Sequence, residues 1–233
     1  IHLNVPDPIV TDFSIRDSCI WFITQAGQLG KRNINSSDND SLTIQQSAPG
    51  QLNSILKLED CLLLGTQQGL FQLDHQFEII DSLSAGTPIY CIQHDLEGNI
   101  VYGGKNSLAL FPGEQFHWIH NLNGHSIHHV HCILAQDSVV WFTPDQGLLR
   151  WMPDLKQSTF TTLTPAALKS DIISIQTVDD TLYCTTSNQG IFYLSPNTQQ
   201  WRSILLPDNL PANSIISSSI TRDGICLGTL NGI

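Results

Sequence analysis

The chain has 233 residues and a mass of 25.8 kDa, enough to bury a sizeable hydrophobic core without disulfides or metals. Its 10 basic and 21 acidic residues give a formal net charge of −11. That charge excludes a protein that coats DNA or RNA, because phosphate binding needs clustered Lys and Arg. No apolar run approaches the roughly 20 residues that cross a bilayer. The sequence begins at Ile1 without a methionine or a signal peptide, so we expect a piece of a longer protein.

Taken in chain order, six segments repeat one pattern: a short apolar strand, a threonine, two or three turn residues, and a glycine followed by an apolar residue. The successive threonine positions are 42, 38, 39, 43 and 43 residues apart. A period near 40 that holds along the whole chain indicates a repeat architecture. The threonine position is filled in turn by Thr24, Thr66, Gly104, Thr143, Thr186 and Thr229.

Each repeat contains four short segments that we expect to form strands. The threonine strand is the second, an apolar run about ten residues earlier is the first, the glycine opens the third, and an aromatic or apolar alternation forms the fourth. The first strands are expected at residues 9–13, 54–56, 89–92, 130–133, 172–175 and 215–216. Fourth strands are expected at residues 77–80, 116–119 and 201–205.

Four strands in about 40 residues is the period of a β-propeller blade. Helical repeats of similar length would show a 3.6-residue periodicity, which no long stretch has. We therefore predict an all-β protein, a single β-propeller domain over residues 1–233 with six four-stranded antiparallel blades. A seventh blade would need roughly 290 residues, so it requires that the chain continue. Residues 1–7 align with the fourth strand at residues 203–208, which predicts a ring that pairs the two ends of the chain.

The repeats also carry, in pieces, a longer motif that consists of an Asp-x-x-Gly turn, an apolar-Trp-x-Gly-Thr strand and a Gly-Leu pair. Residues 95–104 and 223–233 match this motif most fully, residues 61–70 keep its Gly-Thr-x-x-Gly-Leu part, and Trp21 and Trp141 stand on the strand of its tryptophan. The motif resembles the two-component regulator propeller repeat of bacterial two-component and hybrid sensor proteins. The resemblance implies a periplasmic, ligand-sensing propeller that is not itself catalytic. It also implies a membrane-anchored protein with a histidine kinase, cyclase or DNA-binding output domain.

Histidine is concentrated between residues 117 and 131, which hold six of the nine. This segment joins the expected fourth strand of one blade to the first strand of the next, a connection where propellers usually bind ligands. His129 and His131 would share one face of an extended strand, which makes them a candidate pair of metal ligands. Solvated loop histidines are the favoured alternative, because the segment has no Asp or Glu to orient metal ligands. We expect no metal and no cofactor. The residues predicted to contact a ligand are His125, His128, His129, His131 and Trp118.

One cysteine falls in each repeat. Equivalent residues of neighbouring blades should lie about 10 Å apart, farther than the roughly 7 Å between Cα atoms that a disulfide allows. We therefore expect six buried, free thiols, which keep a cytoplasmic address open beside the periplasmic one. Most tryptophans are expected between blades, with Trp118 and Trp151 as the exceptions. The six cysteines are Cys19, Cys61, Cys91, Cys132, Cys184 and Cys226.

Three functions stay open at this point. The favoured one is a sensing domain that binds a small polar ligand such as a saccharide, or a protein partner, and signals through a rearranged homodimer. The second is a free-standing propeller scaffold for protein–protein interaction. The third is a metal-dependent, lyase-like propeller enzyme that uses His129 and His131. No nucleophile elbow, phosphate loop or His-Glu-x-x-His motif occurs, so we expect no catalytic residues in this domain.

Overall fold

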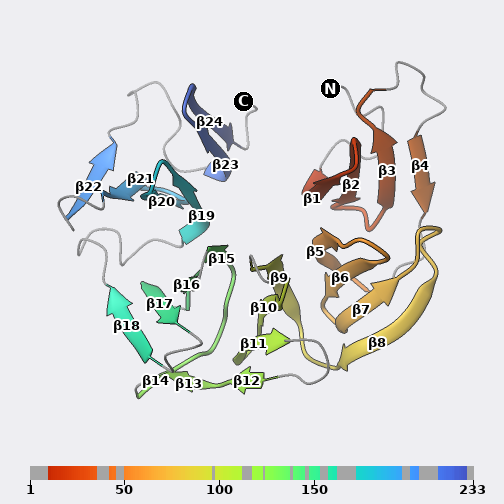
Figure 1. The fold of residues 1–233 in the computed structure, drawn as a ribbon, viewed down its shortest axis with the longest axis horizontal. Helices are drawn as coiled ribbons and strands as arrows, with labels where there is room; N and C mark the ends of the chain where they lie inside the picture. The colour runs from red at the N-terminus through yellow and green to blue at the C-terminus, as the bar shows by residue number, and fades with distance from the viewer. Residues whose placement is uncertain are drawn as a thin grey trace. The chain divides into compact units, whose positions relative to one another are not determined.

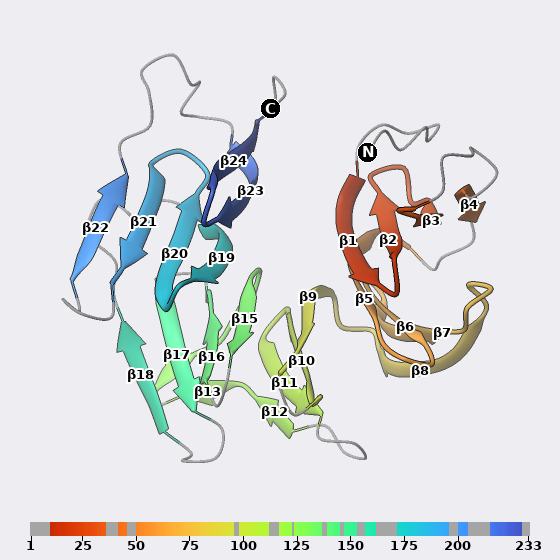
Figure 2. The same ribbon diagram turned by 45° about the horizontal axis from the view of Figure 1, so that its top comes forward.

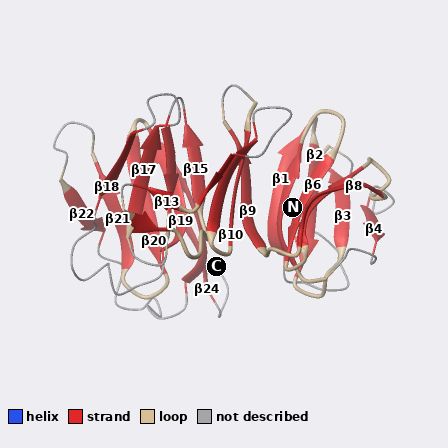
Figure 3. Cartoon of the chain, turned by 90° about the horizontal axis from the view of Figure 1, so that it is seen from below, coloured by secondary structure: helices blue, strands red, loops and turns tan. Residues whose placement is uncertain are grey.

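The structure is a computed structural model that describes residues 10–35, 42–45, 50–95, 98–111, 117–122, 124–136, 139–144, 147–152, 157–161, 172–195, 200–204 and 215–229. All regular elements of these residues are strands (Figure 3). No helix in the described part of the chain is long and apolar enough to cross a membrane. The chain divides into two compact units, residues 1–93 with 100–105 and residues 94–99 with 106–233.

Two complete sheets lie in the first unit. Each is four-stranded and antiparallel, and its strands pair in chain order, as the arrows in Figures 1 and 2 show. Blade 1 is β1 (Val10–Arg16), β2 (Cys19–Thr24), β3 (Leu29–Asn33) and β4 (Leu42–Gln45). Blade 2 is β5 (Leu52–Lys57), β6 (Leu62–Thr66), β7 (Gly69–Leu73) and β8 (Ile79–Ala85).

Three more four-stranded sheets follow along the chain, again with strands paired in chain order. Blade 3 is β9 (Ile89–His94), β10 (Ile100–Gly104), β11 (Ser107–Phe111) and β12 (His117–Ile119). Blade 4 is β15 (Ile133–Gln136), β16 (Val139–Phe142), β17 (Leu148–Met152) and β18 (Gln157–Thr161). Blade 5 is β19 (Ile172–Val178), β20 (Thr181–Thr186), β21 (Gly190–Leu194) and β22 (Trp201–Ile204). Two hairpins complete the elements, β13 (Asn121–Leu122) with β14 (His125–Ser126), and β23 (Ile215–Thr221) with β24 (Gly224–Thr229).

The five up-and-down sheets confirm an all-β fold of propeller blades. The prediction of six four-stranded blades is wrong for the described residues, which form five. Among the described residues the sixth repeat contributes only the hairpin of β23 and β24. Residues 230–233, where its third strand was expected, and residues 1–7, which were to close the ring, lie outside the described residues.

The repeated threonine closes the hairpin between the second and third strands. Thr66 Oγ1 accepts the Gln68 N–H at 2.9 Å and donates to the Gly69 carbonyl at 3.1 Å. Thr186 makes the same pair of bonds, to the Gln189 N–H at 3.1 Å and the Gly190 carbonyl at 2.8 Å. These side chains are fully buried, and each hydroxyl bonds two backbone groups of its turn. The threonine period in the sequence therefore follows from the chemistry of one turn.

The two irregular repeats have local explanations. Gly104 replaces threonine where an added Cβ would overlap the Pro88 carbonyl oxygen. Thr143 was expected to match Thr66, but Phe142 pairs with Leu149 two residues after Gly147, so Thr143 stands one position earlier in the blade. There its Oγ1 accepts, at 3.1 Å, the N–H of Cys132, which immediately precedes β15.

Neighbouring sheets pack through both apolar and polar contacts. Between blades 1 and 2 the core contains Trp21 and Ile23 from β2 and Ile55 from β5, all buried. Polar side chains of one inner strand also accept backbone N–H groups of the next inner strand, which satisfies donors along an otherwise unpaired sheet edge. The bonds in the first unit are Asp12 Oδ2 with the Ile55 N–H (2.9 Å), Ser14 Oγ with the Lys57 N–H (3.0 Å) and Ser54 Oγ with the Ile92 N–H (3.2 Å). In the second unit Gln176 Oε1 accepts the Ile220 N–H at 2.8 Å.

Three expectations about single residues are wrong. Phe77 was placed in a fourth strand, but β8 begins at Ile79, and Phe77 sits in the preceding turn with a φ of 68° and its ring buried against Trp21. Trp151 was expected as an exposed exception, but it is buried on β17, which lies between β16 and β18. All six cysteines are free as predicted, yet Cys226 is exposed because β24 has no third strand beside it among the described residues.

Candidate functional site

Trp118 is placed at the surface by its position on β12, the outermost strand of blade 3. It pairs with the small Ala109 of β11, and its side chain is 39% exposed. A large aromatic side chain at this position reaches solvent, since no further strand of the sheet covers it. The prediction that Trp118 is an exposed exception among the tryptophans is therefore confirmed.

The histidine connection, which we define as residues 120–131, is more ordered than the loop that the sequence suggested. Asn121 and Leu122 pair with Ser126 and His125 in the β13–β14 hairpin. Gly124 takes a φ of 86° in its turn, and the Asn121 Oδ1 accepts the Gly124 N–H at 2.9 Å. This local side-chain bond is the Asx type that stabilises tight turns. The histidine-rich segment is thus held by a hairpin of its own.

Two buried aliphatic residues, Ile127 and Val130, anchor the end of this connection. His128 and His129 lie between these two residues; His128 is exposed and His129 is half-buried. His131, which follows Val130, is exposed. His129 and His131 were expected on the first strand of blade 4, but β15 begins only at Ile133. Their rings nevertheless lie parallel, with an interplanar angle of 6° and centroids 5.9 Å apart. The two histidine side chains therefore lie on the same side of the chain, as expected, although these residues do not belong to β15.

Asn106, in the turn between β10 and β11, bonds to two residues of the histidine connection. Its backbone carbonyl is 2.7 Å from His120 Nδ1, so that nitrogen carries the proton and donates. Its N–H donates to the His128 carbonyl. The His120 ring in turn lies parallel to the Trp118 indole, with an angle of 4° and centroids 6.3 Å apart. In neutral His120 the Nε2 atom is left as an acceptor beside an exposed indole.

The arrangement offers a flat apolar surface next to polar ring nitrogens. Trp118 and His120 supply one parallel pair of rings, and His129 and His131 supply another. His125 contributes its backbone to β14, but its side chain lies outside the described residues. The structure thus places the Trp118 ring beside His120 and the His129 ring beside His131. The His128 carbonyl accepts a hydrogen bond from the Asn106 N–H.

The chemistry for a metal ion is incomplete. No group of three or more His, Cys, Asp or Glu side chains suited to a metal occurs among the residues that the structure describes. Structural zinc sites use four protein ligands and catalytic ones three. His129 and His131 alone supply two imidazoles, so the pair does not make such a site by itself.

His120 and Asn106 are members of this site that the predicted residue set omitted. His120 stands two residues after Trp118, and residues at that spacing share one side of an extended chain, which was the available signal. Asn106 lies fourteen residues away in the preceding turn, with a φ of 61°. Its part in the site depends on how β11 folds back on β12, which no local pattern indicates.

Comparison with known proteins shows similarity in structure only. No protein-family model matches the chain, and no curated protein sequence matches it. Two matching crystal structures are of the extracellular domain of one B. thetaiotaomicron protein, described in one as a proposed one-component system and in the other as a proposed hybrid two-component system. Both are 19% identical over 98% of this chain, with TM-scores of 0.76 and 0.77. A third match is the crystal structure of the computationally designed Ika8 protein, with 8% identity, a TM-score of 0.63, and coverage of 95% of this chain and 80% of that one.

This chain spans 33% of the length of the two bacterial extracellular domains, so it corresponds to about a third of each. At 19% identity the similarity concerns the fold of the backbone. It assigns no function to any residue of the candidate site. Those domains belong to proteins described as signalling systems, the class that the repeat motif resembles. The chain has the β-propeller fold of about a third of each of those domains.

Proposed function

We propose that this chain is part of the extracellular, ligand-sensing propeller of a bacterial signal-transduction protein of the two-component type. The observation that carries the proposal is the match of 98% of the chain to the extracellular domain of a proposed signalling protein. The repeat motif of the sequence supports it independently, because it resembles a sensor-propeller repeat. The domain itself is non-catalytic, and the output is a histidine kinase or cyclase elsewhere in a membrane-anchored protein.

Fusions made after Ile233 in the intact protein test the periplasmic address. An alkaline phosphatase fused there folds only after export, and a fluorescent protein fused there matures only in the cytoplasm. We expect an active phosphatase and a dark fluorescent fusion. A bright fluorescent fusion with an inactive phosphatase would contradict the address and move the scaffold function ahead. Reading the coding sequence for about 200 residues beyond Ile233 tests the output domain.

The ligand is a small, neutral, polar molecule such as a saccharide, bound at Trp118 and the histidine connection. The exposed indole supplies a flat apolar surface for the face of a sugar ring. His120, His128, His129 and His131 supply nitrogens that bond hydroxyl groups, and the net charge of −11 disfavours anionic ligands. His125 lies in the same segment, on β14, and belongs to the proposed site. The bound ligand would rearrange a homodimer, because interfaces between rigid subunits switch more readily than a packed sheet deforms.

Calorimetric titration with a panel of neutral mono- and oligosaccharides tests the site. We expect Trp118→Ala to weaken binding about tenfold or more, as truncation of a central aromatic contact does. His131→Ala should weaken it as well. Ile80→Ala and His94→Ala remove an exposed apolar side chain and an exposed histidine elsewhere, and both should bind like the wild type. A sugar that binds Trp118→Ala and the wild type equally would place the site elsewhere.

A further inference from the structure

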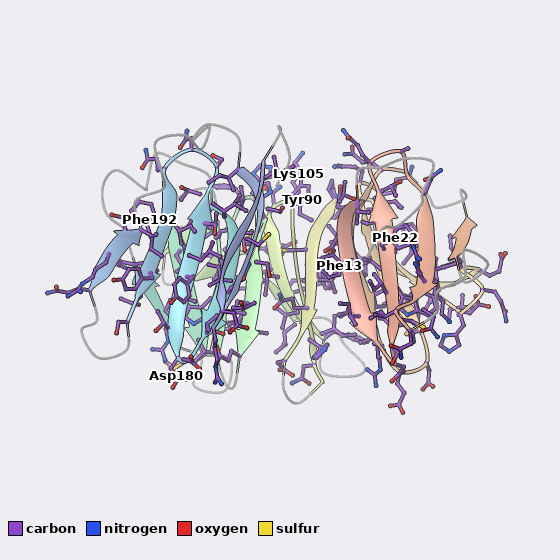
Figure 4. All side chains as sticks on the ribbon, turned by 90° about the horizontal axis from the view of Figure 1, so that it is seen from above. Phe13, Phe22, Tyr90, Lys105, Asp180 and Phe192 are labelled. Carbon is purple, nitrogen blue, oxygen red and sulfur yellow. The ribbon has the colours of Figure 1, made fainter. Side chains whose placement is uncertain are left out.

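The turn between β10 and β11 departs from the threonine turns of blades 2 and 5. It consists of Lys105, which Figure 4 labels, and Asn106. Its residue with a positive φ is Asn106 (61°), whereas in the equivalent turn of blade 2 that residue is Gly69 (137°), at the start of β7. Asparagine is one of the few residues besides glycine that adopt a positive φ readily. A special backbone conformation thus occurs at a residue that bonds twice to the histidine connection.

The Asn106 carbonyl bonds to a side chain where blade 2 has a bond between backbone groups. In blade 2 the carbonyl of Gln68, the residue just before β7, accepts the N–H of Gly86, the residue just after β8, at 2.7 Å. In blade 3 Asn106 stands just before β11 and His120 just after β12. Here the Asn106 carbonyl accepts the Nδ1–H of the His120 ring at 2.7 Å. An imidazole therefore replaces a backbone donor at the same place in the repeat.

The path of the histidine connection is held by bonds that do not involve this imidazole. The Asn106 N–H donates to the His128 carbonyl, and the N–H of the buried Ile127 donates to the His120 carbonyl at 2.9 Å. These backbone bonds fix the chain at both His120 and His128. The bond between the Asn106 carbonyl and Nδ1 therefore acts mainly on the orientation of the His120 ring.

The oriented ring lies at the surface beside an indole. His120 is exposed, and its ring is parallel to that of the exposed Trp118, with centroids 6.3 Å apart. Because Nδ1 carries the proton of the neutral ring, Nε2 accepts hydrogen bonds and cannot donate them. A side chain that is already held in one orientation loses less conformational freedom when a ligand binds. His120 is therefore a preorganised acceptor next to an apolar surface.

We propose that Asn106 is a positioning residue through which the site selects its ligand by one hydroxyl group. By holding His120 with Nδ1 protonated, Asn106 makes Nε2 a contact for O–H donors, while the face of the same sugar unit covers the Trp118 indole. A saccharide meets both requirements, and a derivative in which that hydroxyl is O-methylated has no proton to donate. The selection rests on the proposed function, because it concerns the ligand of the same site.

Nitrogen NMR of the intact protein labelled with 15N-histidine tests the positioning without a ligand. At about pH 8, where free histidine is neutral, we expect the His120 ring to have a protonated Nδ1 and an unprotonated Nε2. Asn106→Gly keeps a residue suited to a positive φ and should preserve this signature, whereas the β-branched Asn106→Val should give a mixture of the two neutral tautomers. A wild-type ring protonated at Nε2, or the wild-type signature in Asn106→Val, would overturn the proposal.

Calorimetric titration of the intact protein with the neutral saccharides, and with derivatives O-methylated at single hydroxyls, tests the selection. We expect one methylation to weaken binding to the wild type about tenfold, as the loss of a hydrogen bond does. His120→Asn keeps a donor near the place of Nδ1 but has no acceptor at the place of Nε2, so it should bind that sugar and its methylated form equally.

His94→Asn is the matched control, because Nδ1 of the exposed His94 also lies near a backbone carbonyl, that of Asp95, at 3.1 Å. This variant should keep the wild-type preference. An undiminished preference in His120→Asn would overturn the inference and leave His120 a structural role, with the proposed ligand intact. Failure of every saccharide to bind the wild type would refute the proposed ligand and the selection together.

Discussion

At the scale of single residues, the buried threonine hydroxyl explains the most regular feature of the sequence. Thr66 Oγ1 makes two bonds with backbone groups of its turn, at 2.9 and 3.1 Å. A methyl group in its place would remove the bond to the Gln68 N–H and leave the buried Gly69 carbonyl without this partner. We expect Thr66→Ala to lower the free energy of unfolding by about 1–3 kcal/mol, the cost of an unsatisfied buried polar group. Urea unfolding measures it, and Thr66→Ser, which keeps the hydroxyl, is the control. Equal losses in both variants would show that the methyl contact matters and the hydroxyl does not.

Asp12 is the one carboxylic acid at a position that the other described blades fill with Ser or Cys. Burial raises the pKa of its carboxyl above the ordinary value of 3.8, although bonds from the Ile55 N–H, the Ser54 hydroxyl and the Phe13 N–H oppose the rise. A raised pKa means that the folded chain binds the proton more tightly than the unfolded chain does. The ionised carboxyl therefore destabilises the fold fully above the folded pKa, and this effect disappears as the pH falls below about 3.8.

We expect the pH dependence to be removed by Asp12→Ser, because serine occupies the equivalent position at Ser54, Ser174 and Ser217 and can accept the Ile55 N–H. Between pH 3 and pH 7, the stability of the wild type relative to this variant should fall as the pH rises above about 3.8. Chemical unfolding at each pH measures the difference. A difference that is constant with pH, or that grows in favour of the wild type, would contradict the assigned shift.

At the scale of elements, polar side chains decide how one inner strand docks on the next. Gln176 of β19 accepts the Ile220 N–H with Oε1 and donates from Nε2 to the Ser218 carbonyl at 2.6 Å and to Ser174 Oγ at 2.8 Å. One amide group thus holds β23 at two backbone positions. The interaction links residues more than 40 apart in sequence, so it belongs to packing and not to local structure.

We expect Gln176→Ala to release β23 from β19. Amide exchange at Ile220 should speed up about tenfold, which corresponds to about 1.4 kcal/mol, while exchange in blades 1 and 2 stays unchanged. Gln67→Ala removes the same group from an exposed turn and is the control. If Ile220 exchanges equally fast in both variants, the amide of Gln176 does not carry the docking of β23.

At the scale of the whole molecule, the burial of the free thiols determines whether they can remain reduced in an oxidising compartment. Cys61 and Cys184 are buried, Cys19, Cys91 and Cys132 are half-buried, and Cys226 is exposed. Burial raises the pKa of Cys132 to about 12, against an opposing hydrogen bond with Thr143, and it raises the pKa of Cys184 as well. Because the thiolate is the reactive form, such thiols resist oxidation in an oxidising compartment while the fold is intact.

Labelling of the folded protein with Ellman's reagent at pH 8 should therefore modify Cys226 first. Cys132 and Cys184 should react only when denaturant unfolds the chain, as mass spectrometry of the labelled peptides will show. Replacement of Cys226 by Ser should remove the fast phase and leave the slow one. Reaction of Cys184 as fast as Cys226 in the folded state would contradict the burial on which a periplasmic address depends.

The repeat period, the all-β class and the hairpin of each blade could be predicted from the sequence, because alternation along a strand and the bonds of a threonine turn are local. The exposure of Trp118 followed from its expected place on an outer strand, and the common side of His129 and His131 followed from their spacing of two residues. What only the tertiary structure decided are features that depend on another strand. They include the shift of Thr143 by one register position, the burial of Phe77 in a turn, the orientation of His120 by Asn106, and the raised pKa of Asp12 beside β5. Each depends on contacts across turns or between blades, and a pattern read along one strand does not contain the strand that packs against it.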